Sequence, residues 1–235
     1  MTEQTAPTGA WRSTTVAHID HPISHGVRLR LDVPDRIDHL PGQHYVIRLT
    51  AEDGYVAQRS YSVASPPSDP QLEFYIERLD DGEVSTFLAD EVRVGDELEV
   101  RGPIGGWFVW RGDVPIVGIG GGSGVVPFVS MLRHGLATGT SELLRLAVSA
   151  RTLADLPYAD ELAEAGALIA LSREPYLARE AARLTSEELA RFQGSTAPSY
   201  FVCGSPAFSR GIVDQLLDAD VPADTIRVES FGPSG

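Results

Sequence analysis

The sequence predicts two domains, an N-terminal antiparallel β-barrel followed by a C-terminal α/β domain with a parallel sheet. Up to residue 112, short strand patterns alternate with turn residues and show little helical periodicity. Beyond Arg111-Gly112-Asp113, apolar strands alternate with helical patterns, which is typical of a parallel sheet covered by helices. We therefore expect the domains to be residues 1–112 and 113–235.

Strands of the first domain are expected at residues 45–49, 72–79 and 97–101, where apolar residues alternate or β-forming residues cluster. Turns are expected at Pro41-Gly42, Asp53-Gly54, Pro66-Pro67 and Asp81-Gly82. Short strands separated by such turns favour a small antiparallel barrel.

In the second domain, strands are expected at residues 114–119, 143–149, 167–171 and 200–203. Helices are expected from the glycine-rich segment to about residue 134, at 155–165, at 185–192 and from residue 205. Thr185 with Glu188 forms a capping-box pattern, and Ser205 precedes a proline at the first helical position. The last helix has an expected apolar face of Phe208, Ile212, Leu216 and Leu217.

Composition excludes several functional classes. Nineteen basic residues against 33 acidic ones give a net charge of −14, which argues against nucleic acid as a partner. The single cysteine, Cys203, cannot form an internal disulfide or ligate an iron–sulfur cluster, and the six histidines lack a ligand set that would complete a metal site. The N-terminus lacks the pattern of a secretory signal, so we expect a cytoplasmic protein. Residues 114–132 carry no charge, but their glycines and Pro127 favour a strand, turn and helix over a membrane span.

A candidate anion site lies in the first domain at Arg59-Ser60-Tyr61-Ser62. Arg59 can hold a phosphate bidentately, and Tyr61 lies on the same strand face. Ser62 faces the other way on a regular strand, so its joining the same site requires a bulge, a twist or a strand end. Further along, Gly82-Glu83-Val84-Ser85-Thr86 places amides and hydroxyls at the start of a helix, which suits either an anion or an ordinary helix cap.

A second candidate site surrounds the glycine-rich segment 118–124. Glycines between a strand and a helix allow a sharp turn and let backbone amides approach a diphosphate, although Ser123 breaks the strict G-x-G-x-x-G fingerprint. The next two strands end in Ser149-Ala150-Arg151 and Ser172-Arg173-Glu174. Serine and arginine suit the 2′-phosphate of NADP, whereas a carboxylate at Glu174 suits the free ribose of NAD.

In their order and approximate spacing, these segments and Cys203-Gly204-Ser205-Pro206 resemble the ferredoxin-NADP reductase family of flavoproteins, from residue 11 to residue 231. The resemblance implies that Arg59 and its neighbour Ser60 bind FAD, that Tyr61 packs beside the isoalloxazine, and that Ser62 hydrogen-bonds flavin N5. It further implies backbone contacts to the flavin and a second diphosphate clamp, which favours FAD over FMN, at Ile76, Glu77, Gly82, Val84, Ser85 and Thr86.

For the second domain, the resemblance implies a nicotinamide dinucleotide on the glycine-rich segment, at Gly121, Gly122, Ser123 and Gly124. NADPH is favoured, with NADH possible, through Ser149, Arg151, Ser172 and Arg173. Cys203, with Gly204 and Ser205, is expected beside the nicotinamide carbon that donates hydride. Phe231 is expected over the flavin ring; since four residues follow it, Glu229 or Ser230 is the alternative residue to face the active site.

The function that follows is an NADPH-dependent, FAD-containing oxidoreductase. Some members of the family carry a fused two-iron cluster domain, whereas this sequence cannot ligate one, so we expect a separate electron acceptor: a ferredoxin, a haem monooxygenase, or a subunit with a metal or molybdenum cofactor. Two alternatives remain, a reductase of free flavin or ferric chelates, and a subunit that binds nucleotides without turnover.

Overall fold

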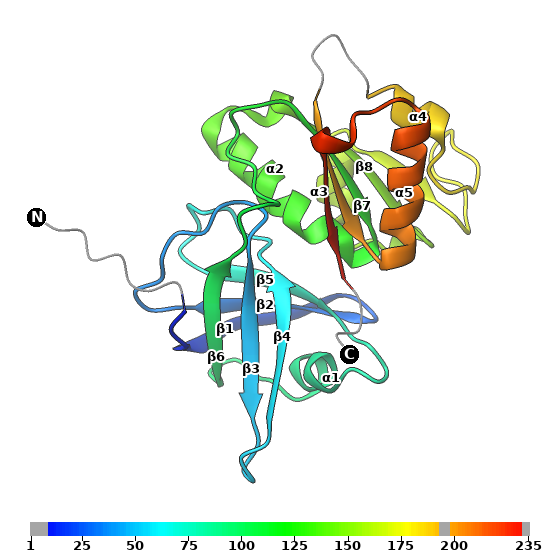
Figure 1. Cartoon of the computed structure of the whole chain (residues 1–235). Helices are drawn as coiled ribbons and strands as arrows, with labels where there is room; N and C mark the ends of the chain where they lie inside the picture. Colours follow the sequence, from blue (N-terminus) through cyan, green and yellow to red (C-terminus); the bar gives the residue numbers. More distant parts are fainter. Residues whose placement is uncertain (1–8, 193–197, 232–235) are drawn as a thin grey trace, which may run out of the picture. The chain divides into compact units, whose positions relative to one another are not determined.

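The computed structural model describes residues 9–192 and 198–231, which form two compact units (Figure 1). The division falls between Val109 and Trp110, where the sequence analysis placed the domain boundary after residue 112. Each unit has its own sheet and its own buried core.

The first unit is an antiparallel six-stranded sheet with the strand order β4-β3-β6-β1-β2-β5. Val63, which follows β4, pairs with Phe74 of β5, and the amide of Ala64 donates to the carbonyl of Glu73 at 2.7 Å. These contacts join the two ends of the strand order and close the sheet into the predicted barrel. The strands are β1 (Arg12–Ile23), β2 (Gly26–Asp32), β3 (His44–Thr50), β4 (Val56–Ser62), β5 (Leu72–Glu77) and β6 (Glu97–Ile104).

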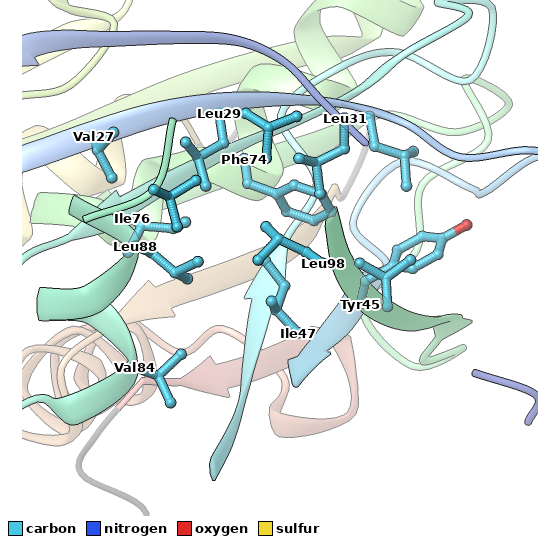
Figure 2. Packing of buried hydrophobic residues seen from close by; sticks show 14 of the residues in the cluster. Val27, Leu29, Leu31, Tyr45, Ile47, Phe74, Ile76, Val84, Leu88 and Leu98 are labelled. Atoms are coloured by element: carbon cyan, nitrogen blue, oxygen red, sulfur yellow. The ribbon is translucent and has the colours of Figure 1, made fainter. Parts of the chain in front are cut away.

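A single helix, α1 (Glu83–Asp90), contributes to the core of the barrel. Figure 2 shows Val84 and Leu88 of this helix among the inward side chains of the strands, with Ile76 beside Leu88. All three are buried. Burying a large aliphatic side chain stabilises the fold by about 1.5–3 kcal/mol. The buried side chains therefore hold α1 on the barrel and fix the position of its first turn.

The second unit is a five-stranded sheet with the order β11-β10-β7-β8-β9, and every strand pair is parallel. The chain runs from β7 through β8 to β9 on one side, then returns to β10 and β11 on the other side of β7. The strand order therefore reverses between β7 and β10, and such a switch point is where open α/β sheets bind ligands, at the carboxyl ends of the strands. The strands are β7 (Ile116–Gly121), β8 (Leu144–Ala150), β9 (Leu168–Leu171), β10 (Ser199–Gly204) and β11 (Ile226–Ser230).

Two helices of 13 residues pack on opposite faces of this sheet, α2 (Val126–Thr138) and α5 (Pro206–Asp218) (Figure 1). A Cβ at Gly118 would lie 2.6 Å from the ring of Phe128 in α2, so glycine permits this close helix–strand packing. On the other face, Ile212 of α5 belongs to the buried cluster that contains Val117 and Ile119. The predicted fold class is confirmed in both units.

The two helix starts that the sequence predicted from capping residues are present in the structure. The Thr185 hydroxyl accepts from the Glu188 amide at 3.3 Å at the start of α4 (Ser186–Ala190), and the Ser205 hydroxyl accepts from the Phe208 amide at 3.2 Å at the start of α5. Leu217 was misplaced on the apolar face of α5, since it is 43% exposed.

The helix expected at 155–165 is two separate pieces, a 3-10 turn (Leu153–Asp155) and α3 (Ala159–Glu164). Pro157 disfavours helical geometry in the residue before it, and Tyr158 has a φ of 59°. Across residues 9–192 and 198–231, none of the helices combines the length and the apolar composition that crossing a bilayer requires.

Candidate functional site

The Arg59-Ser60-Tyr61-Ser62 segment ends strand β4. Arg59 and Tyr61 pair with Ile47 and Tyr45 of β3 and therefore share one face, while Ser62 lies on the opposite face. Arg59 and Ser60 are exposed, Tyr61 is partly buried, and burial raises the pKa of Tyr61 well above its usual range. Because Ser62 is the last residue of β4, it occupies the strand end that its predicted role requires.

The Ser62 side chain is buried, and its hydroxyl has no hydrogen-bond partner among the described residues. Leaving a buried hydroxyl without a partner costs about 1–3 kcal/mol. A ligand or an ordered water is the usual partner of such a buried group. The neighbouring buried serine, Ser65, differs, because its hydroxyl accepts from the amide of Glu73 at 3.0 Å.

The first turn of α1 shows how Gly82, Ser85 and Thr86 shape the second candidate anion contact. The Ser85 hydroxyl donates to the carbonyl of Gly82 at 3.1 Å and accepts from the amide of Leu79 at 3.2 Å. The Thr86 hydroxyl donates to the carbonyl of Leu79 at 3.1 Å. A Cβ at Gly82 would lie 2.2 Å from the Ser85 hydroxyl, so the turn requires glycine. The hydroxyls thus build the turn, and the groups left to face an anion are backbone amides, including that of Val84, whose side chain is buried.

Ile76 and Glu77 are the last two residues of strand β5. They follow Phe74, which pairs with Val63 where the barrel closes. The Ile76 side chain lies in the barrel core, so only its backbone is available to a ligand (Figure 2). Glu77 is half-buried.

In the second unit, the glycine-rich segment packs backbone to backbone against the end of β10. A Cβ at Gly124 would lie 2.4 Å from the carbonyl oxygen of Cys203, and a Cβ at Gly121 or Gly204 would lie 2.7–2.8 Å from the ring of Phe208. Gly122 has a φ of +55° and open space around it. The structure thus brings Gly121, Gly124, Cys203 and Gly204 together at the strand-order reversal. The segment continues as a 3-10 turn (Gly122–Val125), which contains Ser123, before α2 begins.

Cys203 and Glu229 occupy paired positions on β10 and β11, and Gly120 of β7 pairs with Cys203 on its other side. Cys203 is fully buried, and burial together with the charge of Glu229 raises the pKa of its thiol well above the usual range. Burial also raises the pKa of Glu229, to about 7. A neutral, buried thiol suits a packing role and not a nucleophile.

Phe231 is the last described residue, and its amide donates to the carbonyl of Gly204 at 2.9 Å. This bond extends the parallel pairing of β10 with β11 by one step. Phe231 and Glu229 therefore lie at the same end of the sheet as Cys203. The residues after Phe231 lie outside the described part of the chain.

The two predicted serine–arginine pairs lie at the ends of adjacent strands, β8 and β9. The amide of Arg173 donates to the carbonyl of Arg151 at 2.9 Å, so the two backbones are joined there, and both side chains are exposed. Ser149 and Ser172 lie beside them and are half-buried. The carboxylate of Glu174 accepts from the amide of Leu153 at 2.7 Å and so holds a loop in place.

Known proteins resemble the chain in both sequence and fold. Residues 17–109 match the family described as oxidoreductase FAD-binding domain. The reductase component of propane 2-monooxygenase from Mycolicibacterium goodii is 32% identical over 220 residues, which cover 87% of this chain and 62% of the relative. A Ralstonia relative, the ferredoxin–NAD(P)+ reductase component of naphthalene 1,2-dioxygenase/salicylate 5-hydroxylase systems, is 27% identical over 94% of this chain and 69% of its own length.

Among solved structures, the Neisseria gonorrhoeae ferredoxin NADP+ reductase with bound FAD and NADP has a TM-score of 0.79 and 20% identity, covering 94% of this chain and 98% of that one. The chain therefore carries an oxidoreductase FAD-binding domain, and its relatives include ferredoxin–NAD(P)+ reductase components. These likenesses confirm the resemblance that the sequence predicted, and the first unit contains the matched oxidoreductase FAD-binding domain. The chain spans about three fifths of the length of the propane monooxygenase reductases that it matches.

FAD fits the residues present in this domain. The buried Ser62 hydroxyl lacks a partner in the described residues, and Arg59 is a cation on an exposed strand face. The first-turn amides of α1 add anion donors on the same domain.

The sequence analysis missed one contact beside this FAD-binding segment. The Tyr55 hydroxyl, just before β4, donates to the Glu83 carboxylate at 3.1 Å, and Glu83 lies in the first turn of α1. The period-two pattern that places Arg59 and Tyr61 on one face extends back to Tyr55 and identifies it. No sequence signal pairs it with Glu83, since 28 residues separate the two.

Proposed function

We propose that this chain carries electrons from NADPH, through FAD, to a separate acceptor protein. The observation that carries the proposal is the glycine-lined contact of Gly124 with Cys203 at the strand-order reversal, in a chain whose other unit is an FAD-binding domain. A switch point in a parallel sheet is the usual site of a nucleotide, and glycines there allow close approach to a diphosphate.

The charge at the ends of β8 and β9 supports NADPH as the nicotinamide cofactor. Exposed Arg151 and Arg173 offer two guanidinium groups to a 2′-phosphate, with Ser149 and Ser172 beside them. The argument for NADH was Glu174, but one oxygen of its carboxylate accepts from the amide of Leu153, which ties the side chain to a loop. The balance therefore favours the phosphorylated dinucleotide.

The residues of the chain have distinct roles in this proposal. FAD, when bound, supplies the conversion between two-electron and one-electron transfer. Arg59 and the first-turn amides of α1 hold its diphosphate, Tyr61 packs beside its ring, and the Ser62 hydroxyl gains the hydrogen bond that it lacks. Cys203 supplies a small, neutral and buried side chain at the end of β10 where the nicotinamide is proposed to bind, and Glu229 or Phe231 completes that end of the sheet. The protein's contribution is alignment and exclusion of side reactions.

The acceptor is proposed from the relatives, whose names describe reductase components of monooxygenase and dioxygenase systems. We propose an oxygenase component or a ferredoxin as the partner, with a metal- or molybdenum-containing subunit as a further member of the same class. The acidic net charge of −14 makes nucleic acid an unsuitable partner. A cytoplasmic location is part of the proposal.

An anaerobic titration tests the function directly. The purified protein, loaded with FAD, is expected to lose its flavin absorbance near 450 nm on addition of NADPH, and to do so more slowly with NADH. A protein that takes up no FAD, or holds FAD that neither nucleotide bleaches, contradicts the proposal and leaves a nucleotide-binding subunit. Turnover with free FMN or ferric chelates that exceeds turnover with every redox protein tried would instead identify a reductase of diffusible acceptors.

A further inference from the structure

The hydrogen bond between Tyr55 and Glu83 joins the two segments that the proposed function assigns to the FAD diphosphate. Tyr55 precedes β4, the strand that carries Arg59, and Glu83 lies in the first turn of α1. The hydroxyl of Tyr55 is 3.1 Å from the carboxylate of Glu83. The hydrogen bond to Glu83 raises the pKa of Tyr55, whereas the positive charge of Arg59 lowers it. Arg59 therefore lies near the Tyr55–Glu83 pair.

Glu83 brings a negative charge of the protein to the proposed diphosphate contact. The amino end of a helix attracts anions, and a carboxylate in the first turn is drawn to the same free amides that a phosphate would use. A carboxylate is also a good partner for an arginine. A mobile Glu83 side chain would therefore compete with the diphosphate for the α1 amides and for Arg59. In the structure it does neither, because its carboxylate is bound to Tyr55, and the Arg59 guanidinium donates to the carbonyl of Gln58 at 2.7 Å.

We propose that Tyr55 is a positioning residue that holds the Glu83 carboxylate away from the diphosphate contacts and so sets the affinity of the protein for FAD. This inference rests on the function proposed above. The observation behind it is the hydrogen bond between the two side chains, at the edge of the segment that contains Arg59. The hydrogen bond thus keeps the Glu83 carboxylate from occupying the position of the FAD diphosphate.

The fold supports this arrangement without needing the bond for stability. Tyr55 is 56% exposed, and Glu83 is also exposed, whereas α1 is anchored by buried Val84 and Leu88. The hairpin residue Tyr55 is positioned independently, since its amide donates to the Asp53 carboxylate at 3.0 Å and its carbonyl accepts from the amide of Ala51 at 2.8 Å. Removing the Tyr55 hydroxyl therefore frees Glu83 without unfolding either segment.

A double-mutant cycle on the full chain tests the proposal, with the dissociation constant of FAD measured by flavin fluorescence on addition of the FAD-free protein. Tyr55→Phe is expected to weaken FAD binding about five-fold, the upper range for one exposed charge interaction. Glu83→Gln is expected to leave binding unchanged or tighten it. In the Glu83→Gln background, Tyr55→Phe is expected to have no effect, because no charge remains to be released. The loss in Tyr55→Phe should also shrink in 0.5 M NaCl, where exposed charges are screened.

Glu52→Gln is the matched control, since it removes one exposed charge from the same hairpin and is expected to leave FAD affinity unchanged. Equal affinity of Tyr55→Phe and the unmodified protein overturns the proposal. An equal loss from Tyr55→Phe in both backgrounds also overturns it, because Tyr55 would then act without Glu83. Failure of the unmodified protein to bind FAD is a separate outcome and contradicts the proposed function itself.

Discussion

Cys203 and Glu229 occupy paired positions near the carboxyl ends of the neighbouring parallel strands β10 and β11. Strand β10 lies next to β7, where the strand order reverses. Burial raises the pKa of Glu229 to about 7, and the nearby carboxylate contributes to the raised pKa of the Cys203 thiol. Both groups therefore favour their neutral forms in the folded protein. Because Glu229 titrates near pH 7, the charge at this end of the sheet changes with the pH of the solution.

Stability should depend on pH through Glu229. Between its unfolded pKa of 4.5 and its folded pKa of about 7, the folded state keeps a proton that the unfolded state has lost. The free energy of unfolding therefore falls as pH rises through this window and levels off above it, with a contribution of up to about 3 kcal/mol. Glu229→Gln should remove this slope, so the variant gains stability relative to the unmodified protein between pH 5 and pH 8. Urea unfolding followed by circular dichroism at several pH values measures the difference, and a constant difference between the two proteins would contradict the raised pKa.

Ser62 and Ser65 should respond in opposite ways to removal of their hydroxyls. The Ser62 hydroxyl is buried without a partner in the described residues, so Ser62→Ala should leave the stability of the FAD-free protein unchanged or raise it by up to about 1 kcal/mol. Ser65→Ala should lower stability by about 1–2 kcal/mol, because the amide of buried Glu73 loses its acceptor.

The same pair separates a ligand contact from a structural one. Reduction of bound FAD by NADPH, followed by stopped flow, should slow about ten-fold in Ser62→Ala, as expected for loss of one hydrogen bond to the reacting ring. Ser65→Ala should reduce FAD at the normal rate once folded. A Ser62→Ala protein that is destabilised and reduced normally would assign Ser62 to packing.

Gly124 should not tolerate a side chain. A Cβ there would lie 2.4 Å from the Cys203 carbonyl oxygen and 2.6 Å from Cα of Gly204, and backbone atoms cannot move aside as a flexible side chain can. Gly124→Ala is expected to destabilise the protein by about 2–4 kcal/mol and to weaken NADP+ binding. Gly211→Ala is the control, since it lies within α5 with nothing inside 4 Å of its Cβ and should stabilise by about 0.5–1 kcal/mol. Thermal unfolding and NADP+ titration distinguish the two, and equal stability of Gly124→Ala and the unmodified protein would contradict the close contact.

The parts of the fold that sequence reasoning found depend on short-range signals. Ser205 with a following proline, and Thr185 with Glu188, identify helix starts because the capping partners lie three residues apart. The strands β1 and β2 were missed, although Val27 and Leu29 alternate with polar residues and Pro34-Asp35 forms a turn shortly after β2.

What sequence reasoning did not find depends on which distant segments meet. The orphaned hydroxyl of Ser62 and the raised pKa of Glu229 are consequences of burial by packing that no local pattern encodes. The contact of Tyr55 with Glu83 likewise joins two segments 28 residues apart. Motifs identified the candidate site, while its electrostatics required the tertiary structure.

Arg151 and Arg173 should discriminate between the two nicotinamide dinucleotides. Their backbones are joined by the 2.9 Å bond between the ends of β8 and β9, and both side chains are exposed. If they bind the 2′-phosphate, Arg151→Ala and Arg173→Ala should each weaken NADP+ binding about ten-fold, which is the effect of one charge-assisted hydrogen bond, and leave NAD+ binding unchanged. Arg191→Ala is the control, because Arg191 forms an exposed ion pair with Glu187 on α4 and should alter neither affinity. Calorimetric titration of both nucleotides provides the comparison. An equal loss for NADP+ and NAD+ would show that the arginines support the loops and do not contact the distinguishing phosphate.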